Sequence, residues 1–233
     1  MALWQGIRFQ SISGGIVVLL ISIAANGDRM EGQELPSKPL PPGQALQRIR
    51  GRLNQIVQRF GAAHPETNAI VASALPEVDF MIRGWKPGTK IPDTYAKSLT
   101  LDLQVLEKTL MSPVDDAPYP ILRRVADDLK IKADHCRKTG VGLGGLVTLV
   151  VRTKRGGQEL RDLQVLYIPK ILEVVKDARP DLFPKFSSPT SCPLPPGRYV
   201  MWTREPQSNR TGERTVVRVG DGKDTIEWDL PAP

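Results

Sequence analysis

Residues 140–145 read Gly-Val-Gly-Leu-Gly-Gly, and the hydrophobic pattern of the chain changes at this stretch. Before it, apolar residues recur every three or four positions, which is typical of helices. After it they alternate with polar residues, which is typical of strands. The sequence therefore predicts a small N-terminal helical region over residues 46–139 and a C-terminal antiparallel β-sandwich over residues 146–233. The predicted fold class is α+β, with the glycines as a hinge between the two halves.

The same glycines match a nucleotide-binding spacing. Gly140, Gly142 and Gly145 fit G-x-G-x-x-G. In dinucleotide-binding proteins a strand precedes these glycines and a helix begins on them, so that the helix N-terminus faces the pyrophosphate. Here a helix precedes and a strand follows, so we expect no nucleotide and no other cofactor.

The helical region is predicted to contain short helices joined by proline turns. Their expected spans are residues 44–60, 65–75, 95–111 and 120–136, with Pro76 kinking or restarting the second helix before Val78, Met81 and Ile82. The first helix carries one apolar stripe, formed by Leu46, Ile49, Leu53, Ile56, Val57 and Phe60.

Alternating residues predict five short strands in the C-terminal half, near residues 147–153, 163–167, 198–202, 217–219 and 226–230. The turn Arg155-Gly156-Gly157-Gln158 is a hairpin signal. It makes residues 163–167 the expected return strand of the first hairpin.

Residues 1–25 have the order of a secretory signal peptide. Arg8 precedes an apolar run from Ile12 to Ala25 that ends in small residues. The run is shorter than the roughly 20 apolar residues that a membrane span needs. We therefore expect cleavage near Ala25, export to the periplasm or the extracellular space, and no stable membrane span after processing. Residues 26–45 are rich in proline and are predicted to form an extended linker.

Two cysteines, Cys136 and Cys192, follow the predicted signal. In an oxidising compartment such a pair closes into a disulfide, which here would tie the end of the last helix to the sandwich. The alternative is two free, buried thiols, and the Cα separation decides between them. We take the disulfide as the expectation to test.

The sequence offers little catalytic or metal-binding chemistry. His64 and His135 are the only histidines. A zinc site needs three or four ligands with recognisable spacing, so we expect no metal site. The net charge of +7 is spread along the chain instead of gathered in a stripe or tail, and we expect no nucleic-acid partner.

The C-terminal third resembles the carboxypeptidase-regulatory-like or transthyretin-like β-sandwich modules of secreted proteins. The run Leu194-Pro195-Pro196-Gly197-Arg198-Tyr199-Val200 is similar to the "L-P-P-G-x-Y" entry to a middle strand. Residues 147–153, 156–157, 163–167, 217–222 and 226–230 also fit. The stretch from Pro169 to Pro195 is longer than usual in such modules. The resemblance covers about residues 146–233 and implies a scaffold or binding accessory without common catalytic residues.

These observations favour an exported, non-enzymatic protein whose sandwich serves binding or structural presentation at the cell envelope, with an envelope polymer or protein as partner. Alternation places Arg198, Trp202 and Arg204 on one face of a strand. That face is the candidate binding surface. The competing interpretation buries Trp202 in the core.

The alternative function is an envelope hydrolase with a cleft between the helical region and the sandwich. Its candidate groups are Cys136, His135, His64 and the acidic pairs at 115–116 and 127–128. A hydrolase requires at least two of these groups to converge within hydrogen-bond reach in one pocket.

Overall fold

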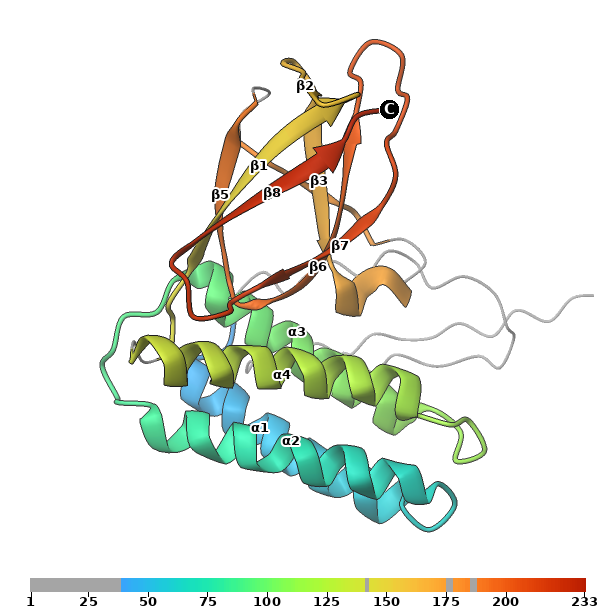
Figure 1. Ribbon diagram of the computed structural model, residues 1–233. Coiled ribbons are helices and arrows are strands. Elements are labelled where there is room, and N and C mark those ends of the chain that lie inside the picture. The colour runs from blue at the N-terminus through green and yellow to red at the C-terminus, as the bar shows by residue number, and fades with distance from the viewer. Residues whose placement is uncertain (1–38, 141–142, 175–177, 185–187) are drawn as a thin grey trace, which may run out of the picture.

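The computed structural model describes residues 39–140, 143–174, 178–184 and 188–233. The predicted signal peptide and most of the predicted linker lie outside these residues. The described chain forms a helical bundle followed by two packed sheets, which confirms the α+β fold class (Figure 1). Among the described helices, none is both long and apolar enough to cross a membrane.

Four helices form the bundle: α1 (Pro42–Phe60), α2 (Pro65–Gly84), α3 (Asp93–Met111) and α4 (Tyr119–Thr139). Helix α1 packs against α2 and α3, and α2 packs against α4. The predicted stripe of α1 faces the core, where Leu46, Ile49 and Ile56 are fully buried. Glycine ends the last helix, because the C-cap Gly140 adopts a left-handed conformation with φ of 65°.

At two prolines the helices differ from the sequence expectation, whereas the other helix ends agree with it within three residues. Helix α1 begins at Pro42, so the end of the predicted linker is helical, with a proline in the first turn where its missing N–H costs nothing. Helix α2 continues through Pro76 to Gly84. Val71 and Val78 are buried on either side of this proline. Packing of one continuous stripe offsets the hydrogen bond that Pro76 removes.

The first sheet contains β1 (Val147–Arg155), β2 (Gln158–Glu159), β5 (Thr190–Leu194) and β8 (Thr225–Pro231). The second has the order β4-β3-β6-β7, formed by β4 (Asp181–Leu182), β3 (Gln164–Pro169), β6 (Gly197–Arg204) and β7 (Thr215–Val219). Strand β8 runs parallel to β1, whereas every other strand pair of the described residues is antiparallel. The predicted antiparallel sandwich is thus correct apart from this pair.

The sandwich core follows the predicted alternation. On β1, Val147, Leu149 and Val151 are fully buried and pack against inward residues of the opposite sheet, such as Met201 and Val217.

The first hairpin is shorter than expected. Gly156 and Gly157 turn the chain with φ of 57° and 84°, but only β2 returns beside β1. The segment predicted as the return strand becomes β3 and pairs with β6 in the second sheet, where Leu166 lies opposite Trp202. Asp162, with φ of 70°, lies where the chain turns away from β2 toward the second sheet.

The stretch between β3 and β5 begins with a short 3₁₀ helix, η1 (Lys170–Val174), and continues into the edge strand β4. η1 contacts β6 and α4, so part of this stretch lies between the sandwich and the bundle.

A buried charge cluster as the candidate functional site

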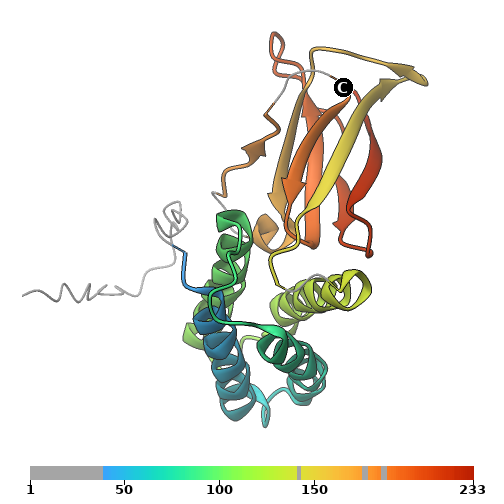
Figure 2. The same cartoon turned by 90° about the vertical axis from the view of Figure 1, so that its left-hand side faces the viewer.

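The two halves meet along α4. Figure 2 shows the strands directly above this helix, whereas α1 and α2 lie on the side of the bundle that is away from the strands. Helix α4 contacts both β6 and η1. The face of α4 that turns toward α3 and β6 is therefore the seam of the molecule.

A fully buried lysine lies in this seam. The Lys132 ammonium donates a hydrogen bond to Asp102 Oδ2 of α3 at 2.8 Å, and both side chains are 1% exposed. Asp128 lies one helical turn before Lys132 on α4, and its Oδ1 accepts a hydrogen bond from the backbone N–H of Arg198 on β6 at 3.2 Å. One charge cluster thus connects α3, α4 and β6.

The cluster holds two carboxylates for one ammonium group. Burial raises the pKa of Asp102 to about 6, although Lys132 opposes this rise; the nearby Asp128 adds to it. Burial likewise raises the pKa of Asp128. Burial alone would lower the pKa of Lys132, but its attraction to both aspartates outweighs that effect and raises it. The cluster therefore carries more negative than positive charge, and the raised pKa values of the aspartates favour protonation of one of them.

Two tyrosines flank the cluster. Tyr95 of α3 is fully buried, and its hydroxyl group lies against the Cys136 thiol. Tyr199 of β6 donates a hydrogen bond from its hydroxyl to the Pro195 carbonyl oxygen at 2.8 Å. This bond closes the Leu194–Val200 run into a corner. Burial raises the pKa of both tyrosines well above the ordinary value, so both stay protonated at neutral pH.

The candidate binding residues Arg198, Trp202 and Arg204 do share one face of β6, but that face is not open. Trp202 is 7% exposed and belongs to a small apolar cluster with Leu166, Ile168 and Val200. The Arg214 guanidinium covers its ring at 4.7 Å.

Both arginines of that set are already engaged. Arg198 forms an ion pair with Asp127 of α4, and Arg204 donates hydrogen bonds to Gln164 Oε1. Arg198 thus contributes to the seam, through its side chain as well as its backbone. The three residues do not form the predicted surface.

The structure does not contain the predicted disulfide, because Cys136 and Cys192 are both free thiols. Cys136 packs against the core of the bundle, whereas Cys192 lies opposite Leu149 on β5 and packs against the core of the sandwich. Each sulfur is directed into its own half. Packing and the charge cluster, instead of a covalent bridge, hold the halves together.

The candidate hydrolytic groups do not converge. His64 Nε2 lies 2.8 Å from the Val114 carbonyl oxygen, and its ring stacks edge-on with Tyr119 at the start of α4. His135 and Cys136 lie near the other end of α4, about 24 Å along the axis from Tyr119 at 1.5 Å per residue.

His135 is buried at the seam beneath Gly220, and burial lowers its pKa. Asp115 and Asp116 are exposed in the loop before α4. The described residues contain no group of three side chains able to hold a metal ion.

Lys132 and Asp102 were missed at the sequence level, although the pattern holds a signal for both. Lys132 continues the apolar stripe of α4 three positions after Leu129, and Asp102 lies three positions after Leu99 on the stripe of α3. A charged residue at a position that the period assigns to the core needs a buried partner.

No family model and no curated protein matches this chain.

Proposed function

We propose that the chain is an exported, non-enzymatic protein in which a β-sandwich is held in one fixed orientation on a helical base, for binding or structural presentation at the cell envelope. The observation that carries the proposal is the charge cluster of Lys132, Asp102 and Asp128. Any other orientation of the halves that kept Asp128 buried would break its contact with the β6 backbone and leave its charge without that partner. An uncompensated buried charge costs about 3–5 kcal/mol, so the orientation is strongly maintained.

The same observation weighs against an envelope hydrolase with a cleft between the halves. Where α4 meets β6, the space is filled by buried side chains, including Lys132 and Tyr199. His64 lies beside Tyr119 at the start of α4, and His135 lies near its end. The half-buried Cys136 thiol has a raised pKa, which makes it a weak nucleophile.

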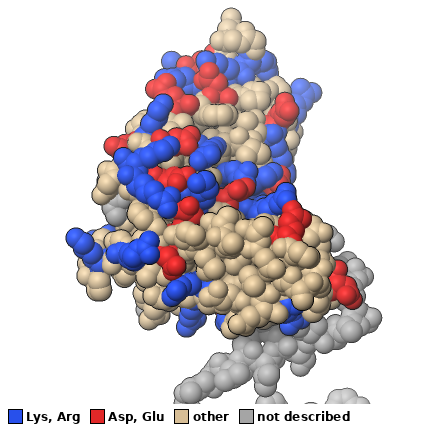
Figure 3. Space-filling model, turned by 60° about the horizontal axis from the view of Figure 1, so that its bottom comes forward, with Lys and Arg blue, Asp and Glu red and all other residues tan. Residues whose placement is uncertain are grey.

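The charge distribution supports an envelope polymer or a protein as partner over nucleic acid. On the face seen in Figure 3, positive and negative side chains are intermixed, and a broad area has few charges. Cross-strand ion pairs on β1 and β8 join Arg152 to Glu227 at 2.6 Å and Lys154 to Asp229 at 2.7 Å. Cations that are neutralised in this way are poorly suited to phosphate backbones.

The outer face of the second sheet is the part of the sandwich best suited to contact a partner. A row across the strands joins Leu182 to Leu166 and then to Trp202, and Val216 lies beside Val200. Leu182 and Val216 are each 45% exposed at the margins of this otherwise covered row. Among the described residues, these are the two exposed large apolar side chains of the sandwich, and we place the contact at them.

The test is site-specific photo-crosslinking in native cells. A photoreactive residue at Leu182 or Val216 is expected to give discrete adducts, and one at the exposed Ala69 of α2 to give none. Adducts at Ala69 alone, or none at either sandwich position, would contradict the proposal. Ester or amide hydrolysis by the purified chain that is lost in Cys136→Ser would favour the hydrolase instead.

Export is tested separately by the intact mass of protein from the native source. The proposal expects a chain that begins near Ala25 in an envelope or extracellular fraction. A cytosolic chain that still carries residues 1–24 would contradict it.

A further inference from the structure

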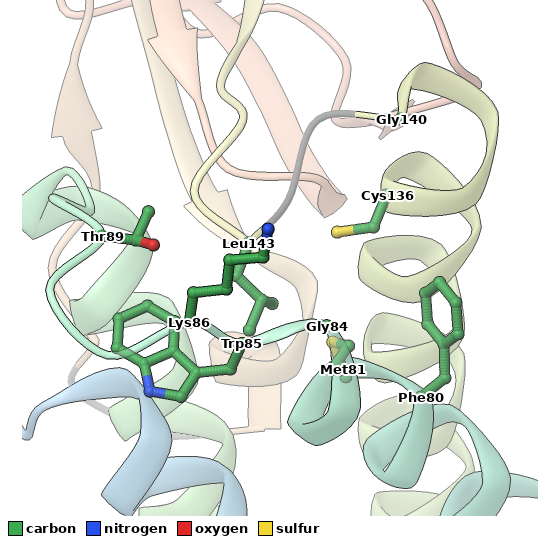
Figure 4. A pocket seen from close by; sticks show the side chains of 9 residues that line it. All are labelled: Phe80, Met81, Gly84, Trp85, Lys86, Thr89, Cys136, Gly140 and Leu143. Carbon is green, nitrogen blue, oxygen red and sulfur yellow. The ribbon is translucent and has the colours of Figure 1, made fainter.

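A cavity of about 370 Å³ lies at the end of the bundle where α2 and α4 finish. Its walls are mostly apolar and come from Phe80, Met81 and Trp85 of the α2 end and from Leu143 before β1. Cys136 of α4 closes one side (Figure 4). The cavity is within the range that small-molecule sites occupy.

The walls of the cavity are held by contacts outside it. The Arg137 guanidinium lies over the Phe80 ring at 4.4 Å and is itself paired with Glu77 and Asp134. The Trp85 indole packs so closely on the start of α1 that a Cβ at Gly43 would lie 2.7 Å from its Nε1. The cavity is therefore preformed, which lowers the entropic cost of binding.

One positive charge borders this apolar space. Figure 4 shows the Lys86 side chain extending across the cavity, with its ammonium end toward the Cys136 sulfur. Lys86 is exposed, and among the described residues no ion pair joins it to a carboxylate. An apolar pocket with one unpaired ammonium is complementary to an apolar chain that ends in an anion.

We propose that this cavity binds an anionic amphiphile: a medium-length acyl chain seated among Phe80, Met81 and Trp85, with its carboxylate at Lys86. At about 30 Å³ per non-hydrogen atom, which is the share of a water molecule in the liquid, the cavity holds about twelve such atoms. Decanoate has this size.

Binding at this site is non-covalent. The Cys136 thiol is protonated at neutral pH, because burial raises its pKa, so it lines the site without attacking the ligand. It also provides a reporter, since a ligand in the cavity would shield it from a thiol reagent. The inference does not depend on the role proposed for the sandwich.

The experiment uses the full chain and two measurements. Isothermal titration calorimetry with decanoate gives the affinity, and the rate of Cys136 alkylation in a Cys192→Ser background locates the ligand. Decanoate is expected to bind and to slow alkylation. Octanoate, shorter by two methylenes, is expected to bind about fifteenfold more weakly. Decyltrimethylammonium, with the same chain and a positive head, is expected not to protect the thiol.

Matched variants test the two halves of the site. Lys86→Met is expected to weaken decanoate binding about tenfold, because the anion loses its partner. Lys90→Met in the same loop, whose side chain does not line the cavity, is expected to change the affinity less than about twofold. Gly84 lines the cavity, and a Cβ there meets no atom within 4 Å. Gly84→Phe is therefore expected to fold normally and to lose binding.

Three results would each overturn the inference. The first is no binding of decanoate up to about 1 mM, which is the weak end of specific affinities. The second is equal protection by decanoate and decyltrimethylammonium. The third is an affinity that is unchanged in both Lys86→Met and Gly84→Phe, each shown to be folded by circular dichroism.

Discussion

Replacing Lys132 by methionine is expected to destabilise the protein more than any surface substitution on the same helix. The lysine side chain is 1% exposed and faces Asp102 and Asp128. Methionine fills a similar volume but removes the ammonium group from two buried carboxylates, of which Asp128 alone keeps a contact with Arg198. Breaking a buried ion pair from one side costs about 3–5 kcal/mol. A domain of this size is stable by about 5–15 kcal/mol, so the loss is a large fraction of the total.

Urea unfolding at pH 7, followed by circular dichroism, measures this effect. With an m value of about 2–3 kcal/mol per molar urea, the midpoint is expected to fall by about 1–2 M. Lys130→Met is the matched control, because Lys130 is exposed on α4 and its ion pair with Asp134 is worth less than about 1 kcal/mol. Adding Asp102→Asn to Lys132→Met is expected to restore part of the loss, because one of the two uncompensated charges is removed.

A double-mutant cycle of Asp102→Asn and Lys132→Met tests whether the two side chains act as one cluster. Residues that contact one another directly show coupling energies of about 0.5–3 kcal/mol. Additive effects of the two substitutions would refute the idea that these side chains act as one cluster. A cost for Lys132→Met no larger than that for Lys130→Met would refute the buried charge itself.

Three other outcomes are expected. The folded pKa of Asp102 is about 6 against an ordinary value of 3.8, so its protonation contributes stability that is fully present below pH 4 and lost as the pH rises to about 6. The advantage of wild type over Asp102→Asn in urea unfolding should therefore be about 2 kcal/mol smaller at pH 7 than at pH 4, and a pH-independent difference would contradict this. Trp202→Ala should cost about 3–5 kcal/mol in unfolding free energy and Trp202→Phe clearly less, because the ring is buried; equal costs would argue against packing. Reducing agents should leave the melting temperature unchanged, and a thiol titration of the denatured, unreduced protein should find both Cys136 and Cys192; a loss of one or both thiols would show that oxidation had occurred.

The sequence predicts the elements of this fold better than their ends. The stripe of α1 has a clear helical period, and its residues are buried as expected. At Pro42 the sequence predicts linker where α1 begins, and at Pro76 it predicts a kink or restart where α2 is one helix. Local preference disfavours proline in a helix, but proline is tolerated in the first turn, and tertiary packing on both sides of Pro76 outweighs the lost hydrogen bond.

Strand pairing is less predictable than strand position. Alternation places Val165 and Tyr167 on one side of β3, as the structure has them, yet the partner of β3 is β6 and not β1. A two-residue turn can be recognised locally, whereas pairing across the sandwich depends on residues distant in sequence. The parallel β1–β8 pair is of the same kind, because it joins the first strand of the sandwich to the last.

The candidate site is partly predictable from the sequence: the positions of its residues can be predicted, but their contacts cannot. Lys132 and Asp102 each occupy a core position of a recognisable helical stripe, and the helical period alone marks both positions as buried. Their contact is between helices and cannot be read from either stripe alone. The link from Asp128 to the Arg198 backbone depends in addition on how the sandwich is placed.

A buried charge cluster is a weak source of stability compared with apolar side chains of the same volume, so its presence at the seam calls for another explanation. Apolar surfaces tolerate many relative orientations, because the hydrophobic effect is not directional. Hydrogen bonds are directional: the bond from Lys132 to Asp102 fixes α4 against α3, and the bond from the Arg198 backbone to Asp128 fixes β6 on α4. The ion pair of Arg198 with Asp127 and the contact of His135 with Gly220 lie on the same helix and favour the same placement. We therefore infer that the cluster sets the angle at which the sandwich is held, and this is the property that a presenting protein needs.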